Sequence, residues 1–210
     1  MTPTRGRLIA LEGIDGCGKS TQARLLAGRL GALATFEPGA TPLGRALRGL
    51  VLGRDGAPVA PRTEALLMAA DRAQHVAEVI APALDAGSWV VTDRYSASTL
   101  AYQGFGRGLD RRELEEHIGW ATGGIRPDLT VLFDLPVAVA AARRRGTGDR
   151  EDRMEAEGSA FQQRVADGYV ALAAERTDPW LVVDATESVE AIADAVWDAV
   201  EVLAGPGGAP

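Results

Sequence analysis

The fold of this chain is decided by the stretch Gly13-Ile14-Asp15-Gly16-Cys17-Gly18-Lys19-Ser20. It matches the pattern G-x-x-x-x-G-K-[ST], in which glycines let successive backbone N–H groups point at a phosphate. The segment 7–12 before it, which is apolar from Leu8 to Leu11, predicts a strand, and the residues from Thr21 onward predict a helix. This context predicts a phosphate-binding loop, or P-loop, at a helix N-terminus. The alternatives are a chance match in a glycine-containing turn and a dinucleotide-binding loop, which would need a third glycine.

The side chains in and near this loop suit ATP bound together with Mg²⁺. Lys19 is the only lysine among 22 basic residues, and its compact ammonium would bridge the β- and γ-phosphates. Ser20 would ligate Mg²⁺, and Asp93, which follows the apolar run 89–92, would be the acidic group near the metal. Arg94 comes next, at the strand edge where ligands bind in parallel sheets. A buried structural pair of Asp93 and Arg94 is the alternative.

Five short apolar runs rich in β-branched residues alternate with stretches of helical spacing. Runs that are nearly continuous in hydrophobicity are typical of strands buried on both faces, and the alternation predicts a parallel sheet. We therefore expect an α/β fold, a P-loop three-layer α/β/α domain over residues 1–204 with a short lid at about 143–157. The tail 205–210 is expected to be disordered. The five predicted strands are Leu8–Leu11, Leu33–Phe36, Trp89–Thr92, Leu129–Phe133 and Trp180–Val183.

Composition narrows the classes of partner. The 210 residues carry a net charge of −7, which argues against a nucleic-acid binder, and no apolar run has the length of a membrane span or signal peptide. The single cysteine, Cys17, allows no intrachain disulfide, so we expect a cytoplasmic protein. Cys17 is more simply explained as a small residue that fits the loop than as a nucleophile, because the sequence places no base beside it. The arginines at 143–145, with Arg150 and Arg153, suit a small polyanion or merely form a solvated helix face.

Taken in order, these features resemble the thymidylate kinases from Leu8 to about Val202. Many kinases share the loop, but other segments are more specific, and together they carry the resemblance: Glu37-Pro-Gly-Ala-Thr-Pro-Leu43, Ala70-Asp-Arg72-Ala-Gln-His75, Asp93-Arg-Tyr-Ser-Ala-Ser-Thr-Leu-Ala-Tyr-Gln-Gly104, Asp152-Arg-Met-Glu155 and Asp184-Ala-Thr186. The resemblance implies a homodimer that transfers the γ-phosphoryl of ATP to thymidine monophosphate (dTMP) and yields dTDP and ADP for dTTP synthesis, with Mg²⁺.

The resemblance also implies two nucleotide sites. ATP would bind Gly13, Ile14, Asp15, Gly16, Cys17, Gly18, Lys19, Ser20 and Thr21, together with Arg143, Asp184, Ala185 and Thr186. The dTMP site would comprise Asp15, Glu37, Arg48, Met68, Arg72, Arg94, Ser98, Thr99, Tyr102 and Gln103. Within it Arg48 and Arg94 would clamp the phosphate, Arg72 would bind the thymine carbonyl, and Tyr102 would lie where a ribose 2′-hydroxyl would project. The implied catalytic residues are Asp15, Lys19, Arg94, Arg150 and Arg153.

Three positions depart from the family's usual pattern. Met68 stands where an aromatic residue is frequent, although a thioether can also pack on a pyrimidine face or in a core. Phe36 stands where an arginine is common, which removes one phosphate contact. Gly16 occupies a loop position at which some members carry an arginine. Members with glycine there supply a lid arginine instead, which implies that Arg150 or Arg153 acts on ATP.

Two other functions compete with this interpretation. One is a kinase of another small acceptor, such as a different deoxynucleotide. The other is an ATP-dependent switch or partitioning protein, whose loops often have a second lysine early in the motif. Here Ile14 and Asp15 occupy that region. A guanine-nucleotide switch would need an Asn-Lys-x-Asp segment, which a chain with Lys19 as its only lysine cannot contain.

Overall fold

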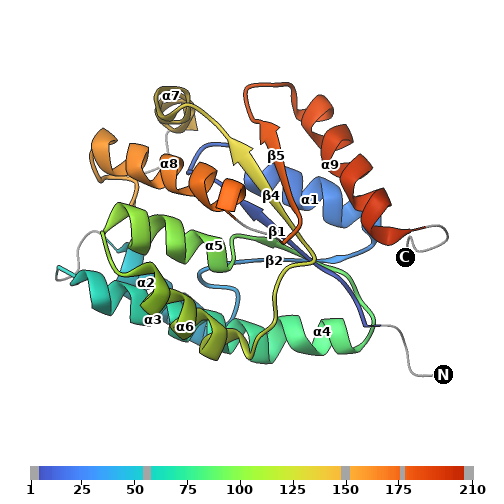
Figure 1. The fold of residues 1–210 in the computed structure, drawn as a ribbon, viewed down its shortest axis with the longest axis horizontal. Coiled ribbons are helices and arrows are strands. Elements are labelled where there is room, and N and C mark those ends of the chain that lie inside the picture. The colour runs from blue at the N-terminus through green and yellow to red at the C-terminus, as the bar shows by residue number, and fades with distance from the viewer. Residues whose placement is uncertain (1–4, 54–57, 148–151, 176–177, 206–210) are drawn as a thin grey trace.

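The structure, a computed structural model, describes residues 5–53, 58–147, 152–175 and 178–205, and its centre is a five-stranded parallel sheet (Figure 1). The strand order is β2-β3-β1-β4-β5, and every neighbouring pair is parallel. The predicted fold class is confirmed, and each predicted strand matches an observed one to within one residue. The strands are β1 (Leu8–Glu12), β2 (Leu33–Phe36), β3 (Val90–Asp93), β4 (Leu129–Asp134) and β5 (Trp180–Asp184).

The centre of the sheet is apolar on both faces because helices cover both. Along β1 the side chains alternate between the two faces. Leu8 and Ala10 belong to the cluster that includes Ile80 and Leu84, whereas Ile9 and Leu11 belong to the larger cluster that includes Leu26 and Val196. The described helices are α1 (Lys19–Leu30), α2 (Pro42–Leu52), α3 (Pro61–His75), η1 (Val76–Ile80), α4 (Ala81–Asp85), α5 (Ser96–Thr99), η2 (Leu100–Gly106), α6 (Arg111–Thr122), α7 (Val137–Thr147), α8 (Ser159–Glu175) and α9 (Val189–Ala204).

The register of the sheet brings the functional residues to one edge. Leu11 of β1 pairs with Asp93 of β3, so β1 and β3 end side by side and their following residues enter adjacent loops. Phe36 of β2 also pairs with Asp93, which sets Glu37 beside that end. In a parallel sheet this carboxyl edge is where ligands bind, because the loops that leave it converge there.

Helix α5 continues into a π-helical segment, η2, which packs closely against α8. Gly168 of α8 makes that approach possible: a Cβ at this position would lie 2.6 Å from Cγ of Phe105 and 2.7 Å from its Cβ. Those atoms lie at the root of the Phe105 side chain, so they cannot swing aside as a flexible tip would. Among the described helices, none combines the length and the apolar composition that crossing a membrane requires.

We expect Gly168→Ala to lower the free energy of unfolding by about 1–3 kcal/mol through overpacking, although alanine favours helices. The matched control is Gly28→Ala in α1, where an added Cβ meets no atom within 4 Å. That variant should be neutral or gain up to about 1 kcal/mol. Urea unfolding of both variants measures the difference, and equal stabilities would contradict the close packing of α8 on η2.

Candidate active site

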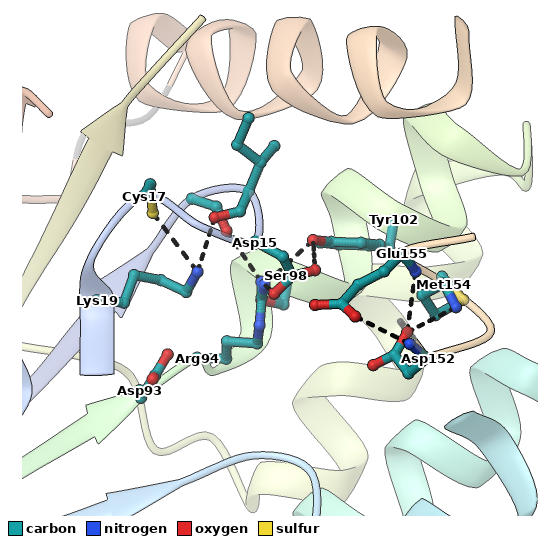
Figure 2. Close-up of polar contacts among 12 residues, drawn as sticks. Asp15, Cys17, Lys19, Asp93, Arg94, Ser98, Tyr102, Asp152, Met154 and Glu155 are labelled. Carbon is teal, nitrogen blue, oxygen red and sulfur yellow. Dashed lines mark hydrogen bonds and ion pairs between the residues drawn. The ribbon is translucent and has the colours of Figure 1, made fainter. Parts of the chain in front are cut away.

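The loop between β1 and α1 has the geometry of an anion cradle. Gly13, Gly16 and Gly18 have φ values of 142°, 89° and 98°, which residues with a Cβ rarely adopt. In the described part of the chain no side chain caps the N-terminus of α1, so its first N–H groups remain available to an anion. Lys19 is buried and folds over the loop, where its Nζ donates to the carbonyl of Ile14 at 2.9 Å (Figure 2).

The two residues expected at the metal lie in contact. Oγ of Ser20, in the first turn of α1, donates to Oδ2 of Asp93 at the end of β3, at 2.5 Å. The pairing follows from the fold, because β1 and β3 are neighbours and α1 begins directly above their carboxyl ends. A hydroxyl and a carboxylate are the hard oxygen ligands that Mg²⁺ accepts, so both residues fit a magnesium ion.

A cavity of about 770 Å³ opens in front of the loop. Arg144 of α7 lies at this cavity and donates from NH1 to the carbonyl of Asp15 at 2.6 Å. Its stem occupies the space above Gly16, where a Cβ would lie 3.2 Å from Cγ of Arg144. Arg144 was not among the predicted site residues, because the sequence of the arginine run does not indicate which side chain turns inward. The predicted Arg143 also lines the cavity.

Arg94 is the centre of the site (Figure 2). It has a φ of 74°, in the left-handed region, and this conformation follows directly on Asp93. Its NH2 contacts Oδ1 of Asp15 at 2.5 Å and the hydroxyl of Tyr102 at 3.1 Å. Tyr102 in turn donates to Oδ2 of Asp15 at 2.9 Å. Burial alone would raise the pKa of Asp15, but the charges of Arg94 and Lys19 hold it well below its usual range.

A buried polar layer lies behind Arg94. NH1 of Arg94 donates to Ser98 and Tyr169, each at 3.1 Å, and Tyr169 donates to Oε2 of Glu12 at 3.0 Å. Glu12 is fully buried, and burial raises its pKa although Ser98 and Tyr169 donate to it. Ser98 was predicted, but Glu12 and Tyr169 were not. Tyr169 is 75 residues from Arg94, so no local spacing could have indicated this contact.

A second, smaller cavity adjoins the first and contains the residues expected to read a base. Arg72 is buried and donates from Nε to Glu37 at 2.9 Å, from NH1 to Thr99 at 2.8 Å and from NH2 to the carbonyl of Tyr95 at 2.8 Å. The other oxygen of Glu37 contacts Nδ1 of His75 at 2.9 Å, so both of its oxygens are engaged by protein. The wall of this cavity also includes Arg48, Leu52, Met68, Asp71, Ser98, Tyr102, Gln103, Asp152 and Met154.

Of the two arginines expected to act from the lid, the structure describes Arg153. Arg153 donates from NH2 to Glu64 of α3 at 2.6 Å and from Nε to the carbonyl of Val51 at 2.7 Å. It therefore lies against α2 and α3 and does not line the cavity at the P-loop. Arg150 lies outside the described residues, as do residues 148, 149 and 151 of the expected lid and 206–210 of the expected tail. Asp152 and Glu155 form a reciprocal cap: Asp152 accepts from the Glu155 N–H and Glu155 accepts from that of Asp152, both at 2.9 Å.

The segment expected near adenine forms a tight turn at the end of β5. Oδ1 of Asp184 accepts from the N–H of Thr186 at 2.8 Å and from its hydroxyl at 2.7 Å. Ala185 is buried and donates its N–H to the carbonyl of Asp134. None of the three lines the cavity at the P-loop, so their contact with ATP stays a prediction.

Comparisons with known proteins agree with this geometry. The family model described as "Thymidylate kinase" matches residues 11–196. A thymidylate kinase of Synechococcus sp. (strain CC9902) is 52% identical over 195 residues, which cover 88% of this chain and 91% of that protein. One of Alkalilimnicola ehrlichii is 46% identical over 94% of this chain and 93% of that protein.

A solved structure gives the same result for the fold. The crystal structure of thymidylate kinase from Ehrlichia chaffeensis superposes with a TM-score of 0.76 at 26% identity, over 94% of this chain and 99% of that one. The match therefore extends over nearly the whole length of both chains. This chain belongs to the thymidylate kinase family.

Proposed function

We propose that this protein transfers the γ-phosphoryl of ATP to dTMP and releases ADP and dTDP. One observation carries the proposal: the cavity at the P-loop and the smaller cavity share Asp15, Glu37, Arg48 and Arg94 in their walls. Two nucleotides that enter from opposite sides would therefore meet with their phosphates at these residues. Phosphoryl transfer needs this alignment above all, because its transition state is reached by positioning and charge neutralisation.

The donor would lie on the P-loop side. Backbone N–H groups of residues 13–21 would cradle its phosphates, and Lys19 would leave the Ile14 carbonyl to contact the β- and γ-phosphates. We propose that Ser20 and Asp93 hold Mg²⁺, because their oxygens already lie together at the edge of this cavity. When bound, Mg²⁺ would neutralise charge on the transferring phosphates. Arg143 and the turn 184–186 remain the proposed contacts of the adenine end.

The acceptor would lie in the smaller cavity. Its phosphate would contact Arg48 and Arg94, and its base would lie toward Arg72, Thr99 and Gln103 with Met68 in the wall. Tyr102, held by Asp15, is proposed to exclude a ribose 2′-hydroxyl. No general base is required, because the phosphate oxygen that attacks is already anionic near neutral pH.

We also propose that residues 143–157 act as a lid of a single domain and that the enzyme works in the cytoplasm, where a lone reduced cysteine is stable. Arg144 and Arg143 lie at the start of this segment and already face the donor cavity. For Arg153 to reach the phosphates, the segment would have to release Glu64. We therefore propose Arg144 as the cation that compensates for Gly16, with Arg150 or Arg153 as the alternative.

A homodimer is proposed through the helices α2, α3 and α6, which pack next to one another (Figure 1). Each exposes a large apolar side chain: Leu50 is 61% exposed, Leu66 57% and Trp120 85%. On α3 and η1 the exposed Leu66, Ala70 and Ala77 recur on one side, and such small residues would let a second copy approach closely.

An acceptor panel with ATP tests the function. We expect dTMP to be the preferred acceptor, with little ATP hydrolysis when no acceptor is present. Lys19→Ala should lower turnover by at least about 100-fold while the circular dichroism spectrum stays unchanged, because it removes charge stabilisation at the migrating phosphoryl. Steady ATP hydrolysis without an acceptor would instead indicate a switch protein, and a fully active Lys19→Ala variant would refute the donor site.

The kcat values of the Arg144→Ala and Arg153→Ala variants would show which of these two arginines contributes more to catalysis. We expect Arg144→Ala to lower kcat by at least about tenfold, because this guanidinium lies against the loop that would hold the γ-phosphate. Arg153→Ala is the matched comparison, since it removes the same group from the other end of the lid. The reverse order of effects on kcat would assign the catalytic cation to Arg153.

Light scattering after gel filtration tests the dimer. The wild-type chain should have the mass of two copies, and Leu66→Asp should shift it to one, because a charge would be buried at the contact. Val202→Asp is the control, since Val202 is 84% exposed on α9, outside the proposed contact. A monomeric wild type, or a dimeric Leu66→Asp variant, would exclude this interface.

A further inference from the structure

Glu64 is a buried anion at the start of α3 that none of the proposed roles uses. It is fully buried, and three side chains donate to it: Gln103 of η2, Arg107 just after η2, and Arg153 of the lid segment. Burial alone would raise its pKa, but the hydrogen bonds from Arg107, Gln103 and Arg153 hold the pKa below its usual value. Glu64 is therefore a carboxylate at neutral pH, and a carboxylate can only accept hydrogen bonds.

This carboxylate decides which way the amide of Gln103 points. Oε1 of Glu64 lies 2.9 Å from Nε2 of Gln103. The reverse orientation would set two acceptor oxygens against each other, so the NH₂ group must face Glu64. The carbonyl Oε1 of Gln103 has no hydrogen-bond partner among the described residues, and Gln103 lines the smaller cavity. The carbonyl of Gln103 can therefore accept a hydrogen bond from a ligand in this cavity.

The neighbouring Arg72 provides hydrogen-bond donors instead. Its guanidinium has five N–H groups, and three of them donate to Glu37, Thr99 and the carbonyl of Tyr95. One N–H on each terminal nitrogen remains without a partner in the described part of the chain. Thr99 and Gln103 are four residues apart on consecutive helical segments, and both line the cavity with Arg72. The wall therefore presents a donor from Arg72 beside an acceptor from Gln103.

We propose that Glu64 is a positioning residue that selects the imide edge of a pyrimidine by orienting Gln103. Thymine and uracil present a carbonyl oxygen next to an N–H, which complements a donor beside an acceptor. Cytosine presents an amino group next to an unprotonated ring nitrogen, so it would oppose donor to donor and acceptor to acceptor. This inference rests on the proposed function, in which the smaller cavity holds the acceptor nucleotide.

The test compares kcat/KM for dTMP, dUMP and dCMP with ATP in the wild type and in variants of Glu64. In Glu64→Gln an amide can pair with Gln103 in either sense, so the orientation is no longer enforced. In Glu64→Asp the charge that binds Arg107 and Arg153 stays, but the shorter side chain withdraws from Gln103, which makes this the variant with the smaller risk to folding. In both we expect the ratio of dTMP to dCMP to fall at least about tenfold. The ratio of dTMP to dUMP should stay within about twofold, because both bases have the imide edge.

The matched control is Glu157→Gln. Glu157 pairs with the same Arg107, at 2.6 Å, but does not contact Gln103, so this variant should keep the wild-type ratio of dTMP to dCMP. Gln103→Met should lower the ratio by itself, and adding Glu64→Asp to it should lower the ratio no further, since Glu64 acts through Gln103. A folded Glu64 variant that keeps the ratio, or an equal fall in Glu157→Gln, would overturn this inference alone. A wild type without activity on dTMP would overturn the proposed function and this inference with it.

Discussion

The guanidinium of Arg94 joins four separate parts of the chain at one point. It donates to the carbonyl of Gly13 and the carboxylate of Asp15 in the P-loop, and to the hydroxyls of Tyr102 in η2 and Tyr169 in α8. The left-handed backbone at Arg94 turns the side chain from the end of β3 across the loop. Because the group is buried, its acceptors cannot exchange it for water without leaving an unpaired charge. A single side chain therefore contacts the P-loop, η2 and α8 at once and helps to fix their arrangement.

The same principle recurs around both cavities, since each buried arginine is held by an acid. Asp15 holds Arg94, and Glu37 holds Arg72. Rigid cations that are oriented during folding need little rearrangement when a ligand arrives, which is the condition for strong electrostatic stabilisation of a transition state. Asp71 extends the acidic layer beneath the base-reading arginine: burial and the nearby Glu37 raise its pKa to about 6, while it accepts from the N–H of Gly39.

Local patterns in the sequence could predict the strands of the sheet, but not the hydrogen bonds between side chains that are far apart in the sequence. The strands were predictable because buried parallel strands are continuous apolar runs, and the contact of Ser20 with Asp93 followed from where those strands end. Contacts that cross long stretches of sequence have no such signature. The ties from Tyr169 to Glu12 and from Arg153 to Glu64 depend on how α8 and the lid segment pack on other elements, which no spacing encodes. The resemblance to a family indicated the residues expected to contact the nucleobase, but it could not indicate which carboxylates form ion pairs with them.

The buried position of Lys19 has a consequence for the chemistry of the whole surface. It is the only lysine, it is 5% exposed, and its ammonium lies against the loop carbonyl of Ile14. No other side chain in the chain carries a primary amine, so acylating or carbamylating agents find no lysine on the outside of the folded molecule. Any such agent that does reach a side-chain amine must enter the phosphate cradle, and a bound nucleotide would shield it there. Modification of the lysine side chain thus measures whether the cradle is occupied, because the arginines on the surface do not react with those agents.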